Sequence, residues 1–174
     1  MASLVVTILG KDRAGLVDSV SGAIANHGGN WEESHMAHLA GQFAGIVLVT
    51  VPDSEADALT RALEALEASG LLSVTVERSE PFSEIGTRTF ALEVVGQDRQ
   101  GIIYDISHVL ATRNVSIAEL ATETRSAPMA GGTLFEAKAL LRAPHDMTEH
   151  DLDEALQTLA DKLLVDIELH DETN

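Results

Sequence analysis

The feature that most restricts how this sequence can fold is an internal repeat, because a chain that carries one segment twice is expected to fold into two similar parts. The segment Gly10–Gly15, GKDRAG, recurs 86 residues later as Gly96–Gly101, GQDRQG. Apolar residues match at the same spacing, as Leu16 does with Ile102. A length of 174 residues accommodates two small domains. We therefore expect two homologous domains in tandem.

The second copy of the repeat is longer than the first. Pro52 corresponds to Pro144, an offset of 92, so six extra residues are expected between Ser126 and Gly132. A short segment rich in turn-forming and charged residues separates the copies. The predicted domains are therefore residues 1–79 and 87–174, with a linker over 80–86.

Both copies show the same order of secondary structure. Leu4–Leu9 and Thr89–Val95 are rich in β-branched residues and end next to glycine, which predicts strands. A helical spacing of apolar residues follows each strand. Gly28 and Asn114 are expected to end these two helices. Ala40-Gly41 is expected to form a hairpin turn between two further strands.

A second helix is predicted in each copy. Ser54 and Thr148 each stand three residues before an aspartate, an approximate capping box that predicts the two helix starts. Closing strands follow, so the order βαββαβ occurs twice. This order predicts an α+β fold of ferredoxin-like domains, each with a four-stranded antiparallel sheet and two helices on one face. Because such sheets leave edges and one face open, we also expect a homodimer.

Composition limits the class of partner. The 28 acidic residues outnumber the 11 basic ones, which gives a net charge of −17. This charge repels nucleic acid and anionic membranes, so any role in transcription is expected to act through a protein partner. The absence of cysteine excludes disulfides and thiolate ligands. No signal peptide or membrane span is apparent, so a cytoplasmic protein is expected.

The repeated Gly-x-Asp-Arg-x-Gly segment lies between a predicted strand and a predicted helix. Backbone N–H groups at a helix start form a natural seat for a carboxylate or phosphate. Arg13 and Arg99 could each hold a carboxylate in bidentate fashion, and Asp12 and Asp98 could pair with an ammonium group. The same loop could instead serve only to shape the corner between strand and helix.

With this loop, the βαββαβ order and Gly28-Gly29-Asn30-Trp31 leading into the second strand, the chain resembles the ACT domain family of small-molecule sensing modules. Two such domains with nothing else attached look most like the glycine cleavage system transcriptional repressor group. The resemblance implies an amino-acid ligand, glycine or a similar small one, bound where domains meet. The family loop commonly has proline where this chain has Ala14 and Gln100.

The resemblance also implies a set of ligand-binding positions. In the first copy the loop would hold the polar end of the ligand, with Asn30 contributing from the neighbouring strand; in the second copy Ser116 stands opposite Asn30. The implied positions are Asp12, Arg13, Ala14, Gly15, Leu16, Asn30, Asp98, Arg99, Gly101, Ile102 and Ser116.

Other chemistry is weakly supported. No nucleophile with a base, paired carboxylates or metal-ligand cluster is evident, so no enzyme activity, metal or cofactor is expected. His35 and His38 lie three apart on a predicted strand and would point to opposite faces. Trp31 is expected to be a half-buried core residue. Two alternatives stay open: a scaffold without a ligand, and an acylphosphatase-like hydrolase that uses Arg13 with Asn30.

Overall fold

The computed structural model describes residues 1–70, 72–79, 87–126 and 131–172. The chain divides into two compact units, Met1–Ser83 (unit 1) and Glu84–Asn174 (unit 2). The predicted linker over 80–86 lies outside the described residues, as do four residues of the predicted insertion. The domain boundaries therefore stay a prediction.

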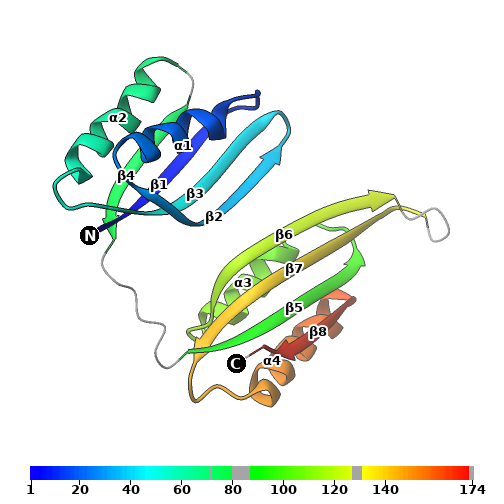
Figure 1. The fold of residues 1–174 in the computed structure, drawn as a ribbon. Helices are drawn as coiled ribbons and strands as arrows, with labels where there is room; N and C mark the ends of the chain where they lie inside the picture. The colour runs from blue at the N-terminus through cyan, green and yellow to red at the C-terminus, as the bar shows by residue number, and fades with distance from the viewer. Residues whose placement is uncertain (71, 80–86, 127–130, 173–174) are drawn as a thin grey trace. The chain divides into compact units, whose positions relative to one another are not determined.

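Each unit has the predicted βαββαβ order (Figure 1). Unit 1 contains β1 (Ala2–Lys11), α1 (Leu16–Asn26), β2 (Asn30–Leu39), β3 (Gln42–Val51), α2 (Ala56–Ala68) and β4 (Ser73–Ser79). Unit 2 contains β5 (Thr87–Gln97), α3 (Ile102–Ala111), β6 (Ser116–Ser126), β7 (Thr133–Pro144), α4 (Glu149–Leu163) and β8 (Val165–Asp171). Both sheets are antiparallel, in the orders β2-β3-β1-β4 and β6-β7-β5-β8, and two helices pack on one face of each. The predicted fold class is confirmed.

Alternation along the central strand builds the core of unit 1. Leu4, Val6 and Ile8 of β1 are buried beneath the helices, while the residues between them point to the other face. α1 buries Leu16 and two further residues at helical spacing against them. Trp31 is partly buried at the edge of this core, as the sequence predicted.

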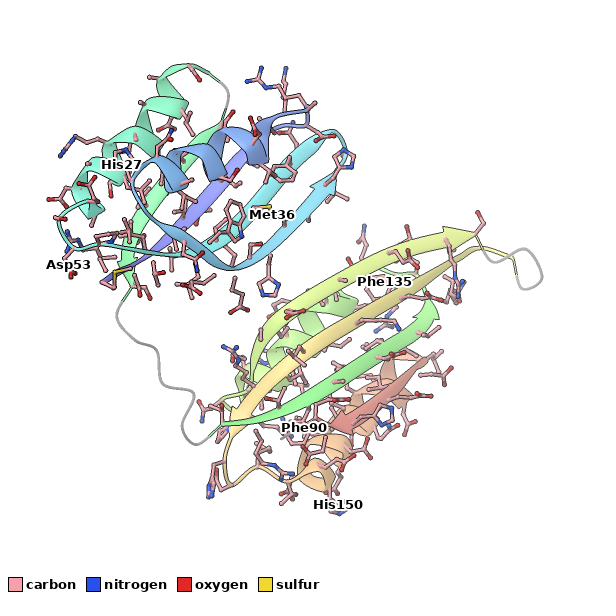
Figure 2. The ribbon with its side chains drawn as sticks, viewed as in Figure 1. His27, Met36, Asp53, Phe90, Phe135 and His150 are labelled. Carbon is pink, nitrogen blue, oxygen red and sulfur yellow. The ribbon has the colours of Figure 1, made fainter. Side chains whose placement is uncertain are left out.

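Unit 2 has a core of the same design. Phe90, on β5, is fully buried among the aliphatic side chains of α3 and α4 (Figure 2). Among the described residues, no buried side chain is polar or charged, so both cores are entirely apolar. Burial of apolar surface is therefore the main stabilising term in each unit.

The predicted helix stops and the hairpin turn are confirmed. Gly28 and Asn114, which are equivalent in the repeat, both adopt left-handed backbone, with φ of 65° and 57°. The chain then turns back, because the N–H of the next residue in each copy donates to a carbonyl near the helix end. Ala40 and Gly41 also have positive φ, as a two-residue hairpin loop requires.

The starts of the second helices differ from each other. Thr148 caps α4 as predicted, and its hydroxyl accepts a hydrogen bond of 3.1 Å from the Asp151 N–H. The matching prediction for Ser54 is wrong. α2 follows Glu55, whose N–H donates to the Pro52 carbonyl at 2.9 Å, so a turn precedes the helix and no side chain caps it. Within the described ranges, no helix is long and apolar enough to cross a bilayer.

The sheet face away from the helices also differs between the units. In unit 1 it carries Val5, Leu9, Ile46 and Leu48, and Leu9 and Ile46 are about half exposed. We call this apolar surface the outer face of unit 1. On the same face of unit 2, Glu93 and Lys138 stand opposite each other and form an ion pair of 3.0 Å.

Candidate functional site

The loop between β1 and α1 has a well-defined backbone. Its Asp12 N–H donates to the Gly41 carbonyl at 3.0 Å, which ties the loop to the β2–β3 hairpin. Gly15 has a φ of 91°, a left-handed conformation that favours glycine. Its carbonyl accepts from the N–H of Ser19 at 3.0 Å and from the Ser19 hydroxyl at 2.8 Å. No side chain caps the start of α1.

The loop between β5 and α3 repeats this backbone closely. The Asp98 N–H donates to the Thr133 carbonyl at 2.8 Å, the position that corresponds to the Asp12 bond. Gly101 has a φ of 90°, and its carbonyl accepts from the Asp105 N–H at 2.9 Å. Again no side chain caps the helix. The glycine at the end of each motif is therefore explained by a left-handed turn that both copies use.

The charged side chains of the two loops have different partners. Arg99 lies 3.8 Å from the Asp105 carboxylate on its own helix. Neither Arg13 nor Lys11 takes part in an ion pair between described residues. Asp12 lies 3.5 Å from the imidazole of His38. Two exposed cations at the loop of unit 1 are thus available to an anionic group from outside the unit.

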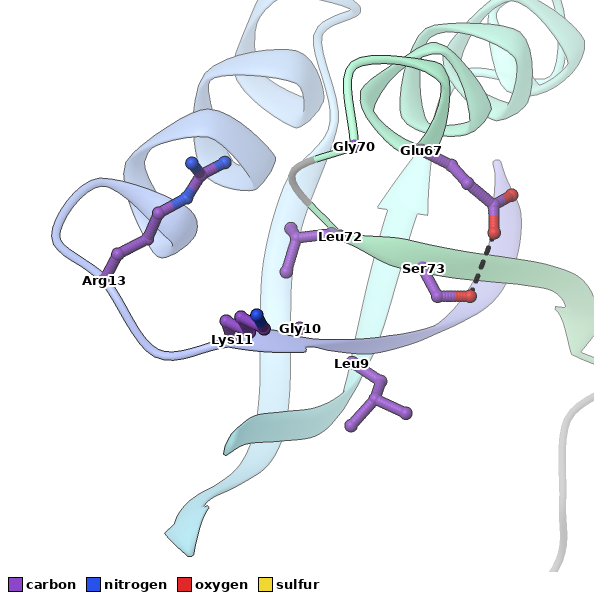
Figure 3. Close-up of a pocket in the computed structure, with 8 residues that line it drawn as sticks. All are labelled: Leu9, Gly10, Lys11, Arg13, Glu67, Gly70, Leu72 and Ser73. Atoms are coloured by element: carbon purple, nitrogen blue, oxygen red, sulfur yellow. Dashed lines mark hydrogen bonds between the residues drawn. The ribbon is translucent and has the colours of Figure 1, made fainter. Parts of the chain in front are cut away.

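These cations border a groove of about 530 Å³ at one end of unit 1 (Figure 3). The groove lies where the end of β1 meets the turn between α2 and β4. Figure 3 shows Arg13 and Glu67 on opposite sides of it, with Leu72 between them. The Ser73 hydroxyl donates to the Glu67 carboxylate at 2.9 Å. The lining residues are Leu9, Gly10, Lys11, Arg13, Glu67, Gly70, Leu72 and Ser73, and we call this cavity the loop groove.

Asn30 does not join this loop within unit 1. It pairs with Thr50, which pairs with Ser3, whereas the loop follows Lys11 at the other end of β1. Eight residues of strand separate the two ends, roughly 26 Å at about 3.3 Å per residue. The Asn30 amide donates to Glu32 at 3.0 Å.

Glu32 also accepts a hydrogen bond of 2.6 Å from the Thr50 hydroxyl. This bond, followed by that from Asn30, lowers the pKa of the exposed Glu32 carboxyl. In unit 2, Ser116 occupies the same far end and its hydroxyl donates to the Arg142 carbonyl at 3.4 Å. Both strand residues are therefore placed away from the loop of their own unit.

The other predicted positions divide into exposed and buried ones. Ala14, Asp98 and Gly101 are exposed. Leu16 and Ile102 are buried in the two cores, so their side chains support the fold and do not line the loop surface. The separation of Arg13 from Asn30 also means that unit 1 does not assemble the pair that the acylphosphatase-like alternative needs.

Three residues of the groove, Lys11, Glu67 and Ser73, are not among the positions predicted from the sequence. Glu67 and Ser73 are more than fifty residues away from the loop along the chain, and only the pairing of β4 with β1 brings them to it. The pairing of Ser73 with Leu9 follows from the βαββαβ order, so the position of Ser73 near the loop could have been inferred from the predicted fold. Lys11 stands at the variable second position of the Gly-x-Asp-Arg-x-Gly motif, a position for which no role was predicted from the sequence.

Metal binding gains no support from the histidines. His38 faces Asp12, and His35 lies 3.4 Å from Glu33. In the part of the chain that the structure describes, no group of three histidine, aspartate or glutamate side chains is arranged to hold a metal ion.

Comparisons with known proteins identify a matching family model and similar structures. A family model described as the ACT domain matches residues 2–77. The crystal structure of an unknown protein from Galdieria sulphuraria is 36% identical, with 98% of each chain covered and a TM-score of 0.87. A structure described as a "putative glycine cleavage system transcriptional repressor" is 21% identical, covers 99% of this chain and 98% of its own, and has a TM-score of 0.73. At that identity the second likeness establishes the shared fold. A search of curated proteins found no significant match.

Proposed function

Since this chain belongs to the ACT domain family, with the ACT fold in each of its two units, we propose that it is a non-enzymatic regulatory protein that senses an amino acid. The observation that carries this proposal is the β1–α1 loop of unit 1. There, Lys11 and Arg13 lie without ion-pair partners among the described residues, beside a groove that also presents Glu67. Opposite charges on two sides of a cavity suit a zwitterion.

Binding would change the conformational equilibrium of the protein. A ligand shifts an equilibrium only by its difference in affinity for the two states, so the groove must be more complete in one arrangement of the chain than in another. We propose that the amino acid favours one arrangement of ACT domains and that a protein partner recognises it. The residues to which we assign the ligand contact are Lys11, Arg13 and Glu67, with Asp12 and Gly15 shaping the loop.

The regulated process is proposed from likeness. The relative described as a glycine cleavage system repressor shares both domains with this chain, so control of glycine cleavage or amino-acid metabolism genes is the proposed role. A net charge of −17 disfavours direct contact with DNA, so we propose action through a protein transcription regulator, in the cytoplasm. A mobility-shift assay should therefore show no salt-sensitive binding of DNA by the purified protein; tight binding would contradict this part of the proposal.

Thermal unfolding against the twenty amino acids tests the sensing role. A ligand at 100 times its Kd stabilises the native state by about 2.7 kcal/mol, which raises the Tm by several degrees. We expect such a rise with at least one amino acid and its loss in Arg13→Gln. The matched control is Arg61→Gln, because Arg61 is an exposed arginine on α2 outside the loop groove. A flat panel would contradict the proposed function.

The outer face of unit 1 favours assembly as a second role. Leu9 and Ile46 are both about half exposed on this face, and the position of Ile46 is taken in unit 2 by Lys138, which forms an ion pair with Glu93. We propose that this face supports the expected homodimer. The double variant Thr7→Glu with Ile46→Lys copies the unit 2 pair onto unit 1 and should lower the dimer fraction in sedimentation velocity. A chain that is monomeric before substitution would contradict the assembly role.

A further inference from the structure

The charges around the loop groove define the ligand more closely than the fold does. We propose that this groove binds an amino acid with a second carboxylate, such as glutamate or aspartate, and does so once per chain. The inference rests on the proposed amino-acid-sensing function and specifies its ligand class.

The number of charges is the first argument. Lys11 and Arg13 contribute two positive charges to the groove, and Glu67 contributes one negative charge. A neutral amino acid, with one carboxylate and one ammonium group, would leave one cation unmatched. An acidic amino acid has two carboxylates and one ammonium group, which match all three side chains. Charge-assisted hydrogen bonds of this kind are about twice as strong as neutral ones.

The orientation of Glu67 is the second argument. The Ser73 hydroxyl donates to one oxygen of its carboxylate at 2.9 Å, which holds the side chain at the groove. An ionised carboxylate has about four acceptor positions, so most of them stay open to an ammonium group. Leu72, which is buried in the core of unit 1, lies between the two charged sides (Figure 3).

The size of the groove is the third argument. A volume of about 530 Å³ lies within the range of about 300–1,000 Å³ typical of small-molecule sites. Glycine has a single carboxylate, which cannot match both cations. The volume accommodates a four- or five-carbon dicarboxylic amino acid.

Unit 2 lacks the same set of charges, which limits the site to one per chain. In the repeat, Gln97 corresponds to Lys11, and Ala160, which is buried, corresponds to Glu67. Asp166 stands where unit 1 has Ser73, since each pairs with the equivalent residue of the central strand. The remaining cation, Arg99, already faces Asp105 at 3.8 Å.

Isothermal titration calorimetry of the full chain with L-glutamate, L-glutamine and glutarate tests the inference. We expect one glutamate per chain, bound about tenfold more tightly than glutamine, because glutamine lacks the second carboxylate. Lys11→Gln should remove this preference and leave glutamine affinity within about twofold. Glu67→Gln should weaken glutamate but strengthen glutarate, which has no ammonium group to pair with Glu67 and is repelled by its charge. Arg61→Gln and Glu64→Gln, on the exposed surface of α2, are the matched controls.

The possible failures separate the two proposals. If glycine or glutamine binds as tightly as glutamate, and Arg13→Gln weakens that binding, the dicarboxylate inference is wrong and the sensing function stands. If no amino acid binds, both are wrong. If the Glu67→Gln variant leaves glutamate and glutarate affinities unchanged, the ligand is not held in this groove. Circular dichroism spectra that match the unsubstituted chain establish that each variant is folded.

Discussion

The loop after β1 and the loop after β5 have the same backbone but different charges. Gly15 and Gly101 differ in φ by only one degree, and each loop is tied by the same kind of backbone bond to the neighbouring hairpin. Arg13 nevertheless has no ion-pair partner among the described residues and borders a groove, whereas Arg99 lies 3.8 Å from Asp105 on the helix that follows it. The backbone of the motif is therefore explained by the corner between strand and helix, and a binding role depends on the side chains around it.

The outer sheet faces of the two units also differ in their side chains. Thr7 and Ile46 of unit 1 correspond to the Glu93 and Lys138 pair of unit 2. Unit 1 thus has both the loop groove and an apolar outer face, and Leu9 contributes to each. The repeat has kept an apolar core of the same design in each unit, whereas we assign binding to unit 1 alone.

Removing a core side chain should give the largest effect and should be equal in the two units. Leu63 and Leu156 are equivalent in the repeat and fully buried. Leu63→Ala and Leu156→Ala should each lower the free energy of unfolding by about 2–5 kcal/mol, because each leaves a cavity. Hydrogen exchange followed by mass spectrometry should show the greatest loss of protection in the substituted unit. A loss in only one of the two variants would show that the cores are not equivalent.

The next largest effect should come from neutralising the loop arginines, which should change glutamate affinity in unit 1 and not in unit 2. Arg13→Gln should weaken glutamate binding about tenfold, equal to about 1.4 kcal/mol, because it removes a cation from the groove. Arg99→Gln should change it by less than twofold, since Arg99 pairs with Asp105. Equal losses in both variants, measured by calorimetry, would contradict the assignment of binding to unit 1.

Replacing the two predicted capping residues should change the free energy of unfolding by a smaller amount, and by different amounts for α2 and α4. Thr148→Ala should cost about 1 kcal/mol, because the Asp151 N–H loses the hydroxyl that caps α4. Ser54→Ala should cost close to nothing, since Ser54 does not cap α2. Urea denaturation of the two variants measures the difference. A cost for Ser54→Ala as large as that for Thr148→Ala would show that α2 has a serine cap after all.

The smallest expected effect is the pH dependence that Glu32 contributes to the stability of unit 1. Hydrogen bonds from Thr50 and Asn30 lower the pKa of Glu32 below its ordinary value of 4.5, so the ionised form stabilises the fold. This contribution is present at neutral pH and is lost as the pH falls below 4.5 through the lowered value. Glu32→Gln should therefore reduce stability slightly at pH 7 and not at pH 3.

The corresponding position in unit 2 is Ala118, which has no carboxylate and provides an internal control. Stability of each unit can be followed by hydrogen exchange at both pH values. An equal effect of Glu32→Gln at pH 7 and pH 3 would show that its ionisation does not contribute.

Most of the fold could be predicted because its signals are local or repeated. The hydrophobic periodicity, the turn residues and the duplicated motif together gave the element order, and Gly28 and Asn114 ended their helices as expected. The prediction that Ser54 caps α2 was wrong because the position of a cap depends on where the preceding turn ends. Here Pro52 accepts a backbone bond from Glu55 and moves the helix start past Ser54.

The candidate site was less predictable because it depends on contacts between distant segments. Arg13 stood in a visible motif, but Glu67 and Ser73 reach it only through the pairing of β4 with β1. Asn30 was assigned to the loop by family resemblance. Because α1 runs back along β1, the strand that follows it must begin at the far end of the sheet, so Asn30 lies away from the loop.

The most direct test of the account is a residue-resolved map of where an amino acid binds. Titration of glutamate into the ¹⁵N-labelled chain should shift the backbone amide signals of residues that line the loop groove, such as Lys11, Arg13, Glu67, Gly70 and Ser73. The signals of residues 95–101 in the equivalent loop of unit 2 should stay in place. Shifts at both loops, or at the unit 2 loop alone, would contradict the assignment of sensing to unit 1.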